Sequence, residues 1–158
     1  MLVDVLASRL RANDMNELET LMKQLIRDEG FVPHAYKDSL GFLTIGVGRL
    51  IDVRKGGGLT REEIMYLLRN DILKHTKAVT DHLYWADPIV IGAARFAALI
   101  NMHFQLGDGL WQFVNTLKFM EAGDYEEAST EVLKSTWAAQ TPERAQRVAE
   151  QLRTNQWV

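Results

Sequence analysis

The segment between Gly30 and Gly58 constrains the fold most, because its pattern differs from that of the sequence on either side. Glycine and proline interrupt short runs rich in Tyr, Phe, Thr, Ile and Val, which is typical of a small hairpin region. The residues Asp38-Ser39-Leu40-Gly41 have turn chemistry, so strands near 35–37 and 42–47 are expected to pair. A short β region inserted into an otherwise helical chain predicts an α+β fold.

Apolar residues at helical spacing fill the rest of the chain. We expect a first helix over residues 2–11 and a second from Met15 that ends at Gly30. Thr60 to Glu63 matches a capping box and predicts a helix of about five turns. Later helices are expected at 89–104, 110–122 and 125–134, and after Thr141 as cap with Pro142 at the first helical position. The residues of that last helix expected to face inward are Ala145, Val148, Ala149 and Leu152.

The predicted arrangement is one domain, with a small β-hairpin lobe and a larger all-helical lobe separated by a cleft and joined by a long helix. Its expected parts are an extra N-terminal helix (1–13), a helix carrying Glu29 (14–29), the β lobe (30–59), a connecting helix (60–80) and the helical lobe (81–158). A chain of 158 residues is the size of one compact domain. We expect it to be monomeric.

Composition excludes several classes of function. The chain has no cysteine, so it suits a reducing compartment, and its net charge of -3 with no cluster of Lys and Arg argues against nucleic acid as a partner. It has neither the layout of a secretory signal nor an apolar run of the ~20 residues that span a bilayer, so no stable membrane association is expected. The four histidines lack metal-ligand spacing. We therefore expect no metal and no cofactor.

Two carboxylates, Glu29 and Asp38, lie close together in this sequence. Cleavage of a glycosidic bond needs a proton for the leaving oxygen and a second carboxylate that activates water or stabilises positive charge. A glutamate at a helix end, partly shielded by packing, can keep its proton, whereas an aspartate in a hydrated turn stays ionised. This assigns Glu29 as acid and Asp38 as base, with Thr44 able to hold the water. Each residue alone also fits a structural role, and their joint occurrence favours catalysis.

The run LIRDEGFVPHAYKDSLGFLTIGVGRL resembles the active-site region of the T4-type phage lysozymes, glycoside hydrolase family 24. Two later runs, INMHFQLGDGLWQFVNTL and KSTWAAQTPERAQRV, resemble that family's cleft helix and C-terminal helix in the same order. The resemblance extends from Leu18 to Trp157 and implies a lysozyme-like fold. It also implies hydrolysis, with inversion, of the β-1,4 bond between N-acetylmuramic acid and N-acetylglucosamine in peptidoglycan.

The same resemblance implies roles for individual residues. Glu29 would be the general acid and Asp38 the carboxylate that places or activates water, with Thr44 completing the site. Arg144 matches an arginine that pairs with the catalytic glutamate. Contacts with the sugar chain, or a place beside them, are implied for Leu50, Phe104, Gln105, Thr116 and Glu131.

Three departures from the family pattern carry expectations of their own. Arg49 stands where the best-known member has a histidine, and we expect it to form an ion pair with Asp71, which interrupts the apolar stripe of its helix. The segment before Thr60 is shorter than in that member, so the β lobe should be smaller. Glu131 replaces an amide and Thr136 an arginine, and with a net charge of -3 the affinity for anionic cell wall should be weaker or unusually salt-dependent.

The resulting hypothesis is an endolysin that accumulates in the host cytoplasm and reaches the wall when a holin-type factor opens the membrane. Two alternatives stay open. A lytic transglycosylase also uses a glutamate but needs no water-directing aspartate, so Asp38 and Thr44 argue against it. A non-catalytic wall-binding or virion module of the same fold would not need Glu29, Asp38 and Thr44 together.

Overall fold

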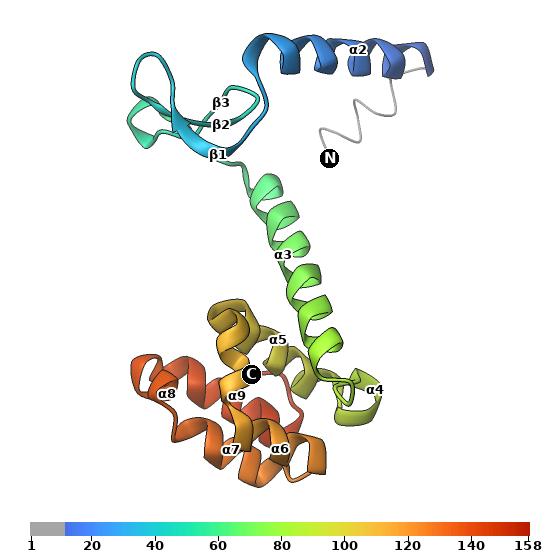
Figure 1. Ribbon diagram of the computed structural model, residues 1–158, viewed down its shortest axis with the longest axis vertical. Helices are drawn as coiled ribbons and strands as arrows, with labels where there is room; N and C mark the ends of the chain where they lie inside the picture. Colours follow the sequence, from blue (N-terminus) through green and yellow to red (C-terminus); the bar gives the residue numbers. More distant parts are fainter. Residues whose placement is uncertain (1–11) are drawn as a thin grey trace. The chain divides into compact units, whose positions relative to one another are not determined.

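The structure is a computed structural model that describes residues 12–158, with side chains from Leu18 onward (Figure 1). Its contacts divide the chain after Glu63 into two compact units. The helix expected at residues 2–11 lies outside the described part. A three-stranded sheet followed by a larger set of helices confirms the predicted α+β class.

The first unit begins with helix α2 (Ala12–Glu29), which ends where the sequence predicts. Gly30 has φ +84° and its N–H bonds to Ile26 O at 3.0 Å, so a glycine closes the last turn. The chain then forms an antiparallel sheet in the order β1–β2–β3, with bounds Val32–Lys37, Leu43–Gly46 and Arg49–Leu50. The pairing of β1 with β2 is the predicted hairpin, whereas the two-residue strand β3 is too short to leave a sequence signal.

The long helix α3 (Arg61–His82) begins with the predicted capping box. Thr60 N–H donates to Glu63 Oε2 at 2.8 Å, and Glu63 N–H donates to Thr60 Oγ1 at 3.2 Å. Each side chain therefore satisfies one backbone N–H that the first turn of a helix leaves free.

The helices of the second unit after α3 differ from the sequence prediction in three places. Instead of one helix over 89–104, Gly92 at φ +95° separates α4 (Pro88–Ile91) from α5 (Ala93–Leu106). The helix predicted at 110–122 is a 3-10 turn, η2 (Gly107–Gln112), followed by α6 (Val114–Ala122). A short helix, α8 (Thr136–Gln140), was not predicted; it lies between α7 (Tyr125–Leu133) and α9 (Pro142–Thr154).

Side-chain caps explain part of these differences. Ser135 Oγ accepts from Ala138 N at 3.1 Å and so begins α8. Thr141 precedes α9 as predicted, but its hydroxyl donates to Trp137 O at 3.0 Å and does not cap the helix. A threonine at the junction of two helices can serve either one, and here it closes the first.

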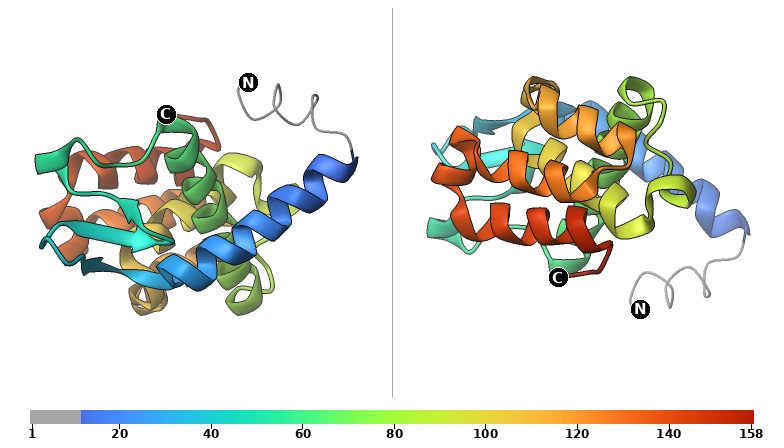
Figure 2. Two further views of the ribbon diagram at one scale, coloured as in Figure 1. Left: turned by 90° about the horizontal axis from the view of Figure 1, so that it is seen from above. Right: turned by 90° about the horizontal axis from the view of Figure 1, so that it is seen from below.

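The hydrophobic core of the second unit draws buried side chains from α5, α7 and α9, and α7 packs against both α6 and α9 (Figure 2). The largest fully buried side chains are Val79, Leu99, Met102, Leu110, Met120, Val132 and Leu152. Burying each such side chain contributes about 1.5–3 kcal/mol, so this cluster fixes the helices together. The four residues of α9 predicted to face inward are all buried. Ile89, expected within a buried helix, is 92% exposed because it lies on α4, before the break at Gly92.

Among the described helices, none combines the length and the hydropathy that crossing a bilayer would need.

Candidate active site

Glu29 is the last residue of α2, and its side chain is exposed to solvent within the first unit. Its carboxylate lies against Gly48, where an added Cβ would be 3.2 Å from Glu29 Oε2. Gly48 has φ +67°, so the tight turn before β3 and the approach of the carboxylate both favour glycine. The packing expected around Glu29 is not supplied by this unit and stays a prediction.

Asp38 is held in the β1–β2 turn by four hydrogen bonds, two to its side chain and two to its backbone. Its Oδ1 accepts from Leu40 N and from Phe42 N, both at 2.9 Å. The turn is closed by Gly41 N–H donating to Asp38 O and by Asp38 N–H donating to Phe42 O, again at 2.9 Å. Both side-chain bonds use Oδ1, which leaves Oδ2 available to accept a hydrogen bond from water.

Thr44 is buried in β2, where it pairs with Tyr36 on one side and Leu50 on the other. Its hydroxyl donates to Phe42 O at 3.3 Å, so the oxygen can still accept a bond from water. The carbonyl of Phe42 thus receives both Thr44 Oγ1–H and Asp38 N–H. Through this one residue the structure brings Asp38 and Thr44 together.

An ion pair between the buried Asp52 and the exposed Arg54 was not found from the sequence. Asp52 is 3% exposed, and its carboxylate accepts from Leu43 N at 3.0 Å and from Arg54 Nε and Nη2 at 2.9 and 2.6 Å. The Arg54 guanidinium, and then the Leu43 amide, hold the pKa of Asp52 well below its usual value. The bond to Leu43 fixes the start of β2, next to Thr44. A lone Asp before a glycine run carries no signal that would identify this role.

Arg49 forms its ion pair with Glu63, the same residue that closes the capping box of α3. The Thr60 N–H bond, with help from Arg49, lowers the pKa of Glu63. Asp71, the partner expected from the sequence, belongs to the second unit, so its pairing with Arg49 stays a prediction. Sequence reasoning overlooked Glu63 because its carboxylate was already assigned to the cap.

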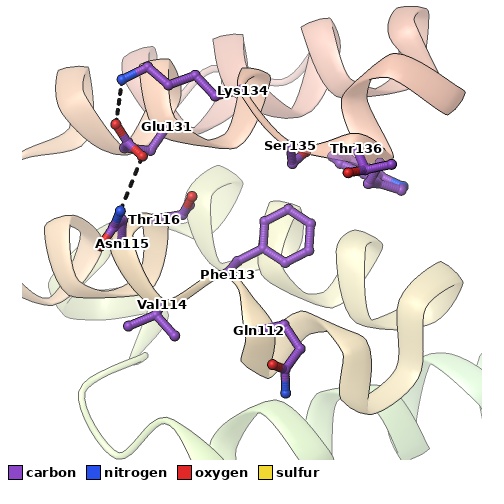
Figure 3. A pocket seen from close by; sticks show the side chains of 10 residues that line it. Gln112, Phe113, Val114, Asn115, Thr116, Glu131, Lys134, Ser135 and Thr136 are labelled. Atoms are coloured by element: carbon purple, nitrogen blue, oxygen red, sulfur yellow. Dashed lines mark hydrogen bonds and ion pairs between the residues drawn. The ribbon is translucent and has the colours of Figure 1, made fainter.

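Two of the predicted sugar-binding residues line one cavity of about 420 Å³ in the second unit (Figure 3). Thr116 of α6 is buried at its wall, and Glu131 of α7 reaches it from the other side. Glu131 Oε1 accepts from Lys134 Nζ at 2.5 Å, and Asn115 Nδ2 donates to Oε2 at 3.4 Å. The Lys134 bond lowers the pKa of Glu131, so a charged carboxylate faces this cavity at neutral pH.

The other predicted residues of the second unit fall into two places. Gln105 Oε1 accepts from Trp137 Nε1 at 3.0 Å, and Trp137 lines the same cavity as Glu131. Phe104 and Arg144 instead line a second cavity of about 400 Å³. Arg144 donates through Nε and Nη2 to Asn101, each at 2.9 Å. Its expected pairing with Glu29 would join the two units and stays a prediction.

Comparison with known proteins places these residues in a family context. Residues 26–153 match the family described as phage lysozyme. The chain is 31% identical to the pre-baseplate central spike protein Gp5 of Enterobacteria phage T4, over 85% of this chain and 28% of that protein. It is 28% identical to a probable T4-type lysozyme 1 of Dictyostelium discoideum, over 87% of this chain and 95% of that protein. An endolysin of Acyrthosiphon pisum secondary endosymbiont phage 1 is 27% identical, over 68% of this chain and 71% of that protein.

These relatives differ in how much of their length corresponds to this chain. The chain spans little more than a quarter of the spike protein but nearly all of the Dictyostelium lysozyme. The matched segment, 26–153, contains all the predicted site residues, including Glu29, Asp38 and Thr44.

Proposed function

Because the chain belongs to the phage lysozyme family, we propose that it is a muramidase that hydrolyses the β-1,4 bond between N-acetylmuramic acid and N-acetylglucosamine in bacterial peptidoglycan. The observation that carries this proposal is the arrangement of Asp38 and Thr44 around the Phe42 carbonyl, with Asp38 Oδ2 bonded to none of the described residues. A fixed carboxylate beside a hydroxyl is what is needed to orient one water molecule.

The proposed reaction divides the work between the two acids. Glu29 donates a proton to the oxygen of the leaving sugar as the bond to the anomeric carbon breaks. Asp38, through Oδ2, accepts a proton from the water that attacks the same carbon, while Thr44 Oγ1 accepts a second hydrogen bond from that water. Attack by water from the face opposite the leaving group inverts the configuration.

The cavity lined by Thr116 and Glu131 is the proposed binding site for the sugar chain in the second unit. A buried hydroxyl, an amide on Asn115 and a carboxylate offer both donors and acceptors, which suits the hydroxyl and acetamido groups of a glycan. The indole of Trp137 adds an apolar surface to the same cavity. Phe104, Gln105 and Leu50 are proposed as further contacts with the sugar chain.

Clearing of purified peptidoglycan by matched variants tests the assignment of the acids. Glu29→Gln should lose nearly all activity, and Asp38→Asn should keep a small part because Thr44 still holds the water. Asp28→Asn is the matched control, since Asp28 neighbours Glu29 and pairs with Arg27 at 2.7 Å. If Glu29→Gln clears peptidoglycan as fast as wild type, Glu29 is not the acid.

The ends of the product separate hydrolysis from the transglycosylase reaction. A reducing N-acetylmuramic acid supports hydrolysis, and an anhydro product would overturn it. The anomer formed first, followed by NMR, reports whether the configuration is inverted.

A non-catalytic wall-binding or virion module is the second candidate, favoured by the similarity to a phage spike protein. That candidate predicts that wild type binds peptidoglycan but releases no reducing ends.

For the hydrolase, the proposed biological role is lysis of a bacterial host. The protein would be a monomer made in the host cytoplasm, and a holin-type factor would give it access to the wall. Expression of the chain with and without a membrane-permeabilising protein tests that role, since cells should lyse only when both proteins are present.

A further inference from the structure

Two cationic side chains lie over one aromatic ring in the first unit. The Arg54 guanidinium carbon is 5.2 Å from the centre of the Phe42 ring, and Lys55 Nζ is 4.8 Å from it. Both distances are within the range in which a cation is attracted to the face of a ring. The ring therefore holds each side chain in place.

These two cations differ in whether a carboxylate compensates their charge. Arg54 forms two hydrogen bonds with the buried carboxylate of Asp52, which compensates its charge. Lys55 is exposed, and within the described part of the chain no carboxylate lies at ion-pair distance from it. The ammonium of Lys55 is thus an uncompensated positive charge on this surface.

The backbone fixes Lys55 as well. It ends the 3-10 turn η1 (Val53–Lys55), where its N–H donates to Asp52 O at 3.1 Å. The next residue, Gly56, has φ +67° and donates to Val53 O at 3.1 Å. Gly57 then packs so closely against β3 that a Cβ there would be 2.8 Å from Leu50 O. A lysine fixed at both ends loses less freedom on binding an anion than an ordinary surface lysine.

The ammonium of Lys55 lies over a residue that is hydrogen-bonded to Asp38, the proposed base. Phe42, under the ammonium of Lys55, donates its N–H to Asp38 Oδ1 and accepts the N–H of Asp38. We propose that Lys55 binds a carboxylate of the peptide stems that peptidoglycan carries on its muramic acid residues; this rests on the proposed muramidase function. One ammonium suits a single carboxylate, and a chain with net charge -3 needs a local cation to approach an anionic polymer.

The test uses soluble glycan strands that keep their peptide stems, with all amines acetylated beforehand. In one half of this material, the carboxamide strands, the carboxylates are converted to carboxamides with carbodiimide and excess ammonia. For Lys55→Gln acting on the strands that keep their carboxylates (carboxylate strands), we expect the half-saturating concentration to rise about threefold and kcat to stay unchanged. A threefold rise corresponds to the loss of one exposed ion pair. On carboxamide strands the variant should equal wild type, and Lys55→Arg should keep most of the wild-type preference.

Lys118→Gln is the matched control, because it removes an exposed charge from α6. An equal preference for carboxylate strands in Lys55→Gln and wild type would overturn the inference while leaving the muramidase proposal intact. A loss of kcat on both kinds of strand would also overturn it, since it would indicate a structural role for Lys55. If wild type cleaves neither kind of strand, the proposed function itself fails, and the inference fails with it.

Discussion

At the scale of single residues, the candidate site depends on close contacts that a sequence pattern does not contain. Gly48 is an example, because the absence of a Cβ leaves room for Glu29 Oε2 beside it. Asp52 is another, because its role depends on burial and on Arg54. The contact at Gly48 leads to a prediction about activity, and the contact at Asp52 to one about stability.

Gly48→Ala should lower activity on peptidoglycan by about tenfold or more, because its Cβ would crowd the Glu29 carboxylate. Gly46→Ala is the control: Gly46 also has positive φ (+69°), but a Cβ there meets nothing within 4 Å. Both variants should lose about 1 kcal/mol of stability from backbone strain. Equal activity in the two variants would contradict a positioning role for Gly48.

Asp52 should make the first unit sensitive to acid. The pKa of Asp52 in the folded chain lies below 3.8, the usual value that applies to the unfolded chain. The stability that Asp52 contributes is therefore complete above pH 3.8 and declines as the pH falls from there toward the pKa of the folded chain. Urea unfolding of wild type and Asp52→Asn between about pH 6 and pH 2.5 measures this, with the difference between them shrinking toward acid. Asp81→Asn, which removes a carboxylate paired with Lys77 on the surface, should show a far smaller difference at neutral pH.

At the scale of elements, individual side chains join helices that are distant in the sequence. Asn155, just after α9, accepts through Oδ1 from Ala94 N and Arg95 N at the start of α5. An added Cβ on Gly92 would be 2.2 Å from the Asn155 side chain, so the break before α5 and this cap require each other. The interruption of the predicted long helix therefore has a tertiary cause.

Asn155→Gly should destabilise the protein by about 1–2 kcal/mol, because two N–H groups of α5 lose their acceptor. Asn155→Asp keeps an acceptor oxygen and tolerates the positive φ of +57°, so it should retain most of the stability. Thermal unfolding of the two variants beside wild type measures the difference. Equal melting temperatures for Asn155→Gly and wild type would show that this cap contributes nothing.

A histidine pair connects α3 with α5 in the same way. His75 Nδ1 and His103 Nδ1 are 2.7 Å apart, so one ring must donate and the other accept. Burial, and then the nearby His75, lower the pKa of His103 below its usual 6.5. His103 thus binds a proton less readily in the fold than in the unfolded chain, so stability should decline as the pH falls below about 6.5.

Unfolding by urea at several values of pH between about 7.5 and 5 tests this pair. Wild type should lose stability over that interval, and His103→Phe should lose much less. His34→Gln, at an exposed position of β1, should follow wild type. An NMR titration that gives His103 a pKa at or above 6.5 would contradict the prediction.

At the scale of the whole molecule, charge is the property that composition alone supplies. A net charge of -3 opposes approach to an anionic wall, and salt screens that repulsion. Between about 0.01 M and 0.15 M salt the screening length falls from about 30 Å to about 8 Å, so wall binding by wild type should improve over this range. Sedimentation with purified walls measures it, and a steady loss of binding with salt would contradict the expectation.

Features that depend on residues close together along the chain could be predicted from the amino-acid sequence. The end of α2 at Gly30, the turn at Asp38, the capping box at Thr60 and the inward face of α9 all follow from spacing and local hydrogen bonding. For the same reason the turn around the candidate base could be located from the order of its residues alone.

Contacts between residues far apart along the chain could not be predicted in this way. The pairing of Arg49 with Glu63, the approach of Gly48 to Glu29 and the cap that Asn155 gives to α5 depend on how separate elements pack. Short elements such as β3 and α8 are likewise set by their neighbours, because two to five residues hold too little pattern to specify a structure alone. Local hydrogen bonding can be read from adjacent residues, whereas burial and long-range contacts exist only once the chain has packed.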